Sequence, residues 1–112
     1  MSDDAVELTV LDDVWAESSG SPLTLFESDE PEAEAGSYVI QPGERVPQEG
    51  WTSHEGDQLS VILEGEVTLV TPDAKYTVSA GTLSVIPAGV EHYSVNETET
   101  PTKLVYTAVG GL

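Results

Sequence analysis

The two histidines, His54 and His92, are the residues whose chemistry is most informative in this sequence. The chain has no cysteine, so thiolate metal sites, disulfides and cysteine nucleophiles are excluded, and imidazole is the best remaining transition-metal ligand. His54 and Gln58 are four residues apart, so on an extended strand their side chains point to one face. His92 opens a later strand, after the tight turn expected at Pro87–Gly89. Two antiparallel strands of a small barrel can bring such residues together across its mouth.

Short β-strands dominate the expected secondary structure. Eight stretches are rich in Val, Ile, Thr and Tyr, often alternate in polarity, and are separated by Gly, Pro and Asp turn signals. Such strands, spaced by roughly 8 to 12 residues, indicate an all-β sandwich or barrel. The predicted strands are Leu23–Glu27, Ser37–Gln41, Leu59–Leu63, Glu66–Val70, Lys75–Ser79, Leu83–Ile86, His92–Val95 and Leu104–Val109.

The length of 112 residues fits a single domain. Residues 1–36 are expected to supply N-terminal strands and an acidic loop to that domain, and residues 37–109 its barrel core. Within the first part, Glu27–Gly36 is predicted to be a solvated acidic loop. Asp12–Ala16 is a candidate for one helical turn.

Charge is the strongest compositional signal: twenty-one acidic residues face only Arg45, Lys75 and Lys103, for a formal net charge of −18. Self-repulsion at this charge destabilises a compact state in dilute buffer. In molar salt the Debye length falls to about 3 Å, so the repulsion is largely screened. The near absence of lysine resembles cytoplasmic proteins of salt-accumulating halophiles. The competing interpretation is an acidic surface for a basic partner. Nucleic-acid binding is excluded because it needs a basic footprint.

The sequence carries no targeting or membrane signal. It has no apolar run of about 18 residues, and its N-terminal stretch MSDDAVELTV is acidic, opposite to the basic start of a signal peptide. We therefore expect a cytoplasmic protein that has no membrane partner.

The spacing around His92 resembles the cupin family. Gly81-x5-Pro87-x-Gly89-x2-His92-x3-Asn96 is similar to the second cupin motif at every defining position. Over roughly Tyr38 to Val109, the resemblance implies an all-β, cupin-type jelly-roll β-barrel with a single domain.

The first cupin motif is matched only in part. His54 falls on its second histidine, Gln58 on its glutamate and Gly65 on its last glycine. Thr52 stands where the first histidine belongs, and Val46 where the first glycine belongs.

The resemblance implies a metal site, because the family usually binds a metal through three histidines and a glutamate. The corresponding set here is His54, Gln58 and His92, holding one divalent ion such as Mn, Fe, Ni or Zn, with a small organic molecule as ligand or substrate. Dioxygenase or isomerase chemistry would be the family expectation, but no catalytic residue can be named. The alternative is a metal-free cupin that serves as a small-ligand sensor or accessory protein, and Thr52 favours it.

Four neighbours of these residues are candidates for the pocket: Thr52, Trp51, Asp57 and Tyr93. Thr52 could orient a water molecule, and Asp57 or Glu91 would supply the missing negative charge if their side chains turned inward. Each also has a structural interpretation, as a strand residue, as aromatic packing or as a solvated acid. The histidines and Gln58 can likewise be hydrogen-bonded structural residues.

The resemblance also implies a homodimer, since cupins of this size usually pair through exposed sheet edges and exchanged terminal strands. Residues Met1 to Leu25 are the candidates for that exchange.

Overall fold

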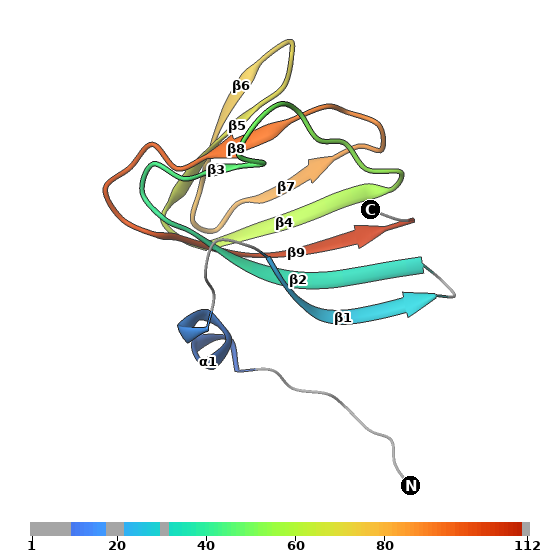
Figure 1. Ribbon diagram of the computed structural model, residues 1–112, viewed down its shortest axis with the longest axis horizontal. Coiled ribbons are helices and arrows are strands. Elements are labelled where there is room, and N and C mark those ends of the chain that lie inside the picture. Colours follow the sequence, from blue (N-terminus) through green and yellow to red (C-terminus); the bar gives the residue numbers. More distant parts are fainter. Residues whose placement is uncertain (1–9, 18–21, 30–31, 111–112) are drawn as a thin grey trace, which may run out of the picture.

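The computed structural model describes residues 10–17, 22–29 and 32–110, which form one short helix and nine strands (Figure 1). The elements in chain order are α1 (Leu11–Ala16), β1 (Leu23–Asp29), β2 (Glu32–Ile40), β3 (Arg45–Val46), β4 (Asp57–Glu64), β5 (Glu66–Val70), β6 (Lys75–Ser79), β7 (Leu83–Ile86), β8 (Tyr93–Val95) and β9 (Thr102–Val109). No helix in these ranges is long and apolar enough to cross a bilayer.

The strands form two antiparallel sheets that face each other. The first has the order β1-β2-β9-β4-β7, and the second has the order β3-β8-β5-β6. Apart from β1–β2 and β5–β6, strands that follow each other in the chain lie in different sheets, so the chain crosses repeatedly from one sheet to the other. Repeated crossings between two antiparallel sheets are typical of a jelly roll, so the predicted all-β, jelly-roll fold class is confirmed.

Alternating side chains from both sheets form the core. Eight buried residues make one cluster between the sheets, because along each strand every second side chain points inward. The cluster consists of Tyr38, Ile40, Ile62, Val67, Leu69, Val78, Ile86 and Leu104.

The side chain of Asn96 holds the connection between β8 and β9 in place through hydrogen bonds made inside the fold. Its side chain is fully buried, and its amide nitrogen donates to the carbonyls of Ile40 (2.9 Å) and Thr100 (2.8 Å). Its amide oxygen accepts from the backbone N–H (2.9 Å) and the hydroxyl (2.6 Å) of Thr98. All four hydrogen-bonding positions of the amide are therefore used, and the motif asparagine has an architectural role.

Most predicted strands are confirmed, and β5, β6 and β7 have the predicted bounds. The acidic loop predicted at Glu27–Gly36 is wrong, because β1 continues to Asp29 and β2 begins at Glu32. Pairing of the two strands, for example Glu27 with Glu34, satisfies the backbone groups that a loop would leave to water. No sequence signal indicated β3, a two-residue strand that exists through its pairing with β8.

Candidate functional site

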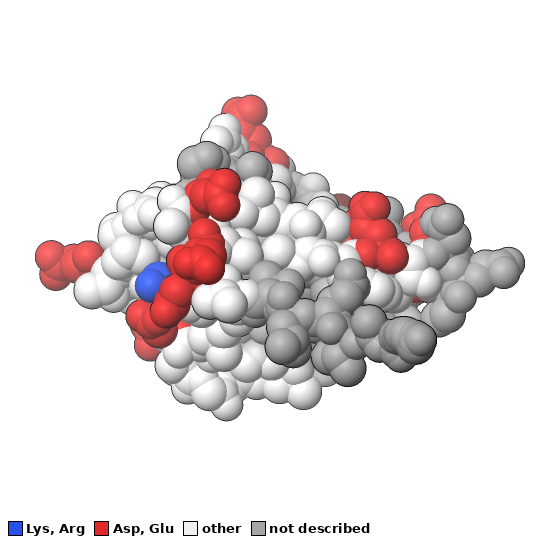
Figure 2. All heavy atoms as spheres, turned by 90° about the horizontal axis from the view of Figure 1, so that it is seen from below, with Lys and Arg blue, Asp and Glu red and all other residues white. Residues whose placement is uncertain are grey.

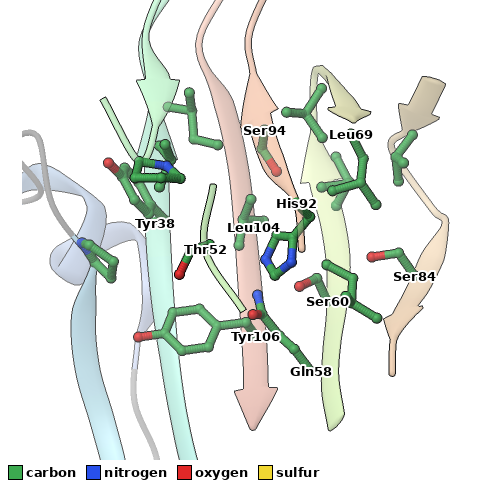
Figure 3. A pocket seen from close by; sticks show the side chains of 18 of the residues that line it. Tyr38, Thr52, Gln58, Ser60, Leu69, Ser84, His92, Ser94, Leu104 and Tyr106 are labelled. Carbon is green, nitrogen blue, oxygen red and sulfur yellow. The ribbon is translucent and has the colours of Figure 1, made fainter. Parts of the chain in front are cut away.

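A cavity of about 250 Å³ lies between the two sheets (Figure 3). All eight residues of the core cluster line it, so the cavity is the unfilled centre of the barrel. The remaining lining residues are Pro22, Val46, Pro47, Thr52, His54, Gln58, Ser60, Ser84, His92, Ser94 and Tyr106.

Strand alternation and one backbone bridge bring the predicted site residues together. Gln58 and Ser60 point inward from β4, with Ile62 next on the same face. His92 precedes β8 and exchanges two backbone hydrogen bonds with Thr52, of 2.8 and 3.0 Å. The His54 carbonyl accepts from the backbone N–H of Gly89, at 2.9 Å. His54, Gln58, His92 and Thr52 therefore all line one cavity.

His92 is buried in a defined orientation, with 4% of its surface exposed. Its Nδ1 lies 2.9 Å from the carbonyl oxygen of Val90. A carbonyl oxygen can only accept, so Nδ1 carries the proton and donates to it. The other ring nitrogen, Nε2, is then a hydrogen-bond acceptor or a potential metal ligand in the neutral ring.

His54 lies beside His92, with ring centroids 5.4 Å apart and an angle of 61° between the ring planes. Desolvation by burial lowers the pKa of His54 below its ordinary value of 6.5, and the neighbouring His92 lowers it further. A hydrogen bond with Gln58 acts in the opposite direction, because the amide oxygen accepts from the imidazolium N–H. The balance favours a neutral His54 at pH 7.

None of the nineteen lining residues is Asp, Glu, Lys or Arg. Asp57 is exposed, and its Oδ1 accepts the backbone N–H of Ala88 at 2.9 Å, on the outside of the turn before His92. Glu91 is also exposed. The structure therefore does not turn either carboxylate toward the histidines, and the polar end of the cavity is uncharged when both imidazoles are neutral.

Trp51 and Tyr93, two of the predicted pocket residues, do not line the cavity. Their rings pack against each other outside it in a tilted arrangement, with centroids 5.2 Å apart and 59° between the ring planes, and the guanidinium of Arg45 lies 3.8 Å from the centre of the Tyr93 ring. Arg45 also donates to the carbonyls of Pro47 and Gly50, each at 2.9 Å. This group anchors the segment that leads into Thr52, so its role is to position the cavity wall.

Two tyrosines in the wall were not among the predicted site residues. Tyr38 donates to a Glu44 carboxylate oxygen at 3.4 Å, and burial together with that carboxylate raises its pKa to about 12. Tyr106 donates to Glu34 at 3.4 Å, and burial, followed by the Glu34 charge, raises its pKa. Both phenols are therefore protonated at neutral pH. In Figure 3, the Tyr106 hydroxyl points away from the Gln58 amide and the His92 ring.

The serines that line the cavity, Ser60, Ser84 and Ser94, were also missed as pocket residues. A sequence signal for two of them existed, because Ser60 is two residues from Gln58 and Ser94 is two residues from His92. Residues at that spacing share a strand face.

The donor set limits which metal ion the cavity would suit. Among residues 10–17, 22–29 and 32–110, no group of three or more His, Cys, Asp and Glu side chains is placed to hold an ion. His54, Gln58 and His92 together offer two imidazoles and an amide oxygen. Such a neutral set fits a weakly held ion of the kind that imidazole prefers, with water completing its shell.

Comparison with known proteins identifies the same fold. Residues 36–108 match the family described as "Cupin domain". The structure resembles that of a protein from Thermus thermophilus, with 26% identity and a TM-score of 0.73 over 93% of this chain and 98% of that one. It also resembles a Cupin 2 conserved barrel domain protein from Salinispora arenicola, with 22% identity and a TM-score of 0.74 over 94% and 89% of the two chains.

A third similar structure is an uncharacterized conserved protein with a double-stranded β-helix domain from Klebsiella pneumoniae, at 18% identity and a TM-score of 0.76 over 96% of this chain and 92% of that one. No curated protein matches the sequence significantly. The comparisons thus identify the fold and the family.

Proposed function

Because the chain belongs to the cupin domain family, we propose that its barrel binds a small, uncharged organic molecule, with His54, Gln58 and His92 at the polar end of the site. The observation that carries this proposal is the lining: an apolar cavity with a few convergent polar groups and no Asp, Glu, Lys or Arg side chain. Small-molecule sites have this composition. At about 250 Å³ the cavity lies just below their usual range, which begins at roughly 300 Å³, so the ligand is small.

Charge selects the class of ligand. Burying an isolated carboxylate or ammonium in an apolar cavity is costly unless an opposite charge pairs with it. The lining offers no such partner, and the net charge of −18 adds a field that repels anions. A hydroxyl or N–H group on the ligand matches the acceptor Nε2 of His92, and the Gln58 amide can both donate and accept.

Matched probes test this selectivity. Benzyl alcohol, benzoate and benzylamine share a skeleton and differ in charge at pH 7.5. We expect ligand-observed saturation-transfer NMR on the metal-free protein to detect benzyl alcohol and to show at least about tenfold weaker binding of the two ions. Equal binding of benzoate or benzylamine would contradict the proposal.

A pair of variants locates the polar end of the site. His92→Phe keeps the ring volume but removes the Nε2 acceptor, so benzyl alcohol should bind at least about tenfold more weakly, the effect of one lost hydrogen bond. Ser79→Ala, at an exposed position of β6 outside the cavity, is the control and should bind normally. Unchanged binding by His92→Phe would remove His92 from the site.

A second candidate function, binding of one divalent metal ion, is favoured by the orientation of His92. Metal-binding histidines usually donate the second ring N–H to a carbonyl or carboxylate, as Nδ1 of His92 does to Val90. His54, Gln58 and His92 would hold the ion. When bound, it would supply an electrophilic centre with open positions, of the kind that polarises a ligand oxygen. The absence of an anionic ligand predicts modest affinity.

Metal titration separates the two candidates. Untagged protein is stripped with EDTA and titrated by calorimetry with Mn²⁺, Fe²⁺, Ni²⁺ and Zn²⁺ in molar KCl. The metal hypothesis expects one equivalent of at least one ion, lost in His92→Ala without loss of the far-UV CD spectrum. Binding of less than one equivalent of every ion would refute it. The small-molecule proposal would stand, because its probes are tested without metal.

A further inference from the structure

Five polar side chains are buried in the described part of the chain, and only some of them find all their hydrogen-bond partners inside the protein. They are Ser37, Ser60, His92, Asn96 and Thr102. Asn96 and Thr102 bond with neighbouring groups of the fold. Ser37 lies on the outer face of β2, away from the cavity. His92 and Ser60 remain, and both line the cavity.

Ser60 brings a buried hydroxyl to the cavity wall. The residue is 8% exposed, and its hydroxyl has no hydrogen-bond partner among the residues that the structure describes. An unpaired hydroxyl in an apolar interior costs free energy, so its partner has to come from inside the cavity, either from water or from a ligand. Ser60 is two residues from Gln58 and shares its face of β4, which places this hydroxyl beside the polar end of the site.

A second serine lies directly opposite the first. Ser84 of β7 pairs with Ser60 of β4 in the antiparallel register, and side chains at paired positions have Cβ atoms about 5 Å apart. Figure 3 shows the hydroxyls of Ser60 and Ser84 pointing from their strands toward the side of the cavity where the His92 ring lies. These two residues, the serine pair, therefore form a second polar group on the wall, next to the one that Gln58 and His92 form.

We infer, as an extension of the small-molecule function proposed above and resting on it, that the ligand is an uncharged diol. One hydroxyl would bond with His92 and Gln58, and the other with the serine pair. Two residues along a strand span about 6.6 Å, which is comparable with the distance between two oxygens on a meta-substituted ring. A ligand with a single polar group would displace water from the serine pair and leave apolar atoms against its hydroxyls.

The charges of the protein favour a hydroxyl over an ion as the second group of the ligand. Carboxylates project from the outer surface, as the face drawn in Figure 2 shows, and the net charge of −18 opposes the entry of an anion. An ammonium group would be attracted to that surface, but no carboxylate lines the cavity to pair with it. A hydroxyl carries no charge, and it can donate to one serine while it accepts from the other.

Two probes of nearly equal size test for the second polar group. 3-Hydroxybenzyl alcohol and 3-methylbenzyl alcohol are both uncharged at pH 7.5 and differ by a hydroxyl in place of a methyl group. We expect saturation-transfer NMR on the metal-free protein to show at least about tenfold tighter binding of the hydroxy probe, because the methyl group leaves two hydroxyls of the wall unpaired. Equal binding, or tighter binding of the methyl probe, would overturn the inference.

Benzyl alcohol separates this result from a failure of the proposed function. If benzyl alcohol binds and the hydroxy probe gains nothing over the methyl probe, the serine pair has no part in recognition, while the small-molecule function stands. If none of the three alcohols binds, the small-molecule function fails and the diol inference fails with it.

Variants locate the effect on the wall. Ser60→Ala combined with Ser84→Ala should abolish the preference for the hydroxy probe and leave the methyl probe bound at least as tightly. The melting temperature should not fall, since both substitutions remove hydroxyls without a partner in the described part of the fold. Ser84→Ala alone, at a half-buried position of an edge strand, should reduce the preference in the same direction.

Ser94→Ala is the matched control, because Ser94 lines the same cavity from β8 of the other sheet. It should keep the preference for the hydroxy probe. A preference that survives the loss of both serines of the pair, or that Ser94→Ala removes to the same extent, would refute the assignment.

Discussion

Replacement of Asn96 by alanine tests whether the motif around His92 serves architecture or binding. The Asn96 side chain makes four hydrogen bonds, all within the protein, and none reaches the cavity. Asn96→Ala should therefore unfold more easily while still placing His92 in the same cavity wall.

The magnitude follows from those bonds. A buried hydrogen bond contributes about 1 kcal/mol net, so removing four costs about 4 kcal/mol. The Thr100 carbonyl can regain a partner in the variant, because the Thr98 hydroxyl, no longer donating to Asn96, lies 3.0 Å from it and can donate to it instead. The expected loss in the free energy of unfolding is therefore about 3 to 4 kcal/mol, a large fraction of the stability of a domain of this size.

Urea unfolding followed by CD in 2 M KCl measures this loss, since urea leaves the ionic strength unchanged. Asn96→Asp is the matched variant: it keeps the acceptor but turns the donor that faces the carbonyls of Ile40 and Thr100 into a second acceptor. It should destabilise the fold at least as much as alanine does at neutral pH. A loss below about 1 kcal/mol in Asn96→Ala, or full stability in Asn96→Asp, would refute the assignment.

Three further predictions concern pH, salt and turn geometry. Because folding lowers the pKa of His54, the unfolded chain binds the proton more readily, and the free energy of unfolding should fall as the pH drops from 6.5 through the folded pKa. The His54→Gln variant should flatten this part of the plot of urea midpoint against pH. An unchanged plot would contradict the prediction. The melting temperature should rise by at least about 5 °C between 0.1 M and 2 M KCl, because a gain of roughly 1 kcal/mol in the free energy of unfolding gives a shift of this size in a domain of this length. Equal melting temperatures at the two salt concentrations would argue against salt adaptation. Gly65→Ala should lose roughly 3 kcal/mol by urea unfolding, because φ is +85° and a Cβ would lie 2.8 Å from the Pro101 carbonyl. Gly81→Ala, with φ of +86° but open space, should lose about 1 kcal/mol, and equal losses would exclude the clash.

The fold could be predicted from the sequence where local pattern and tertiary pairing agree. The strands β5, β6 and β7 alternate in polarity between clear turns, and their bounds are as predicted. The prediction of a loop at Glu27–Gly36 rested on the high acidic content of the segment. That prediction is wrong because the charged and small residues of the segment alternate largely as in a strand. The short strand β3 depends on its partner β8 and has no local signature.

The site could be predicted where the spacing of residues along one strand determines which side chains share a face. His54, Gln58 and His92 follow from even spacing and the motif, and Thr52 lies with them because of its backbone bridge to His92. Tyr93 is adjacent in sequence to His92, so alternation alone places it on the opposite face of the strand. Tyr106 reaches the cavity from β9, and only the order of strands in the sheet brings it there.

The placement of the two tryptophans has a practical consequence for spectroscopy. Trp51 packs against Tyr93 outside the cavity, and Trp15 lies in α1 with the Lys103 ammonium 5.1 Å from the centre of its ring. Neither indole lines the cavity. Tryptophan emission will therefore report the docking of α1 and of the segment before Thr52, while occupation of the barrel by a ligand will leave it almost unchanged.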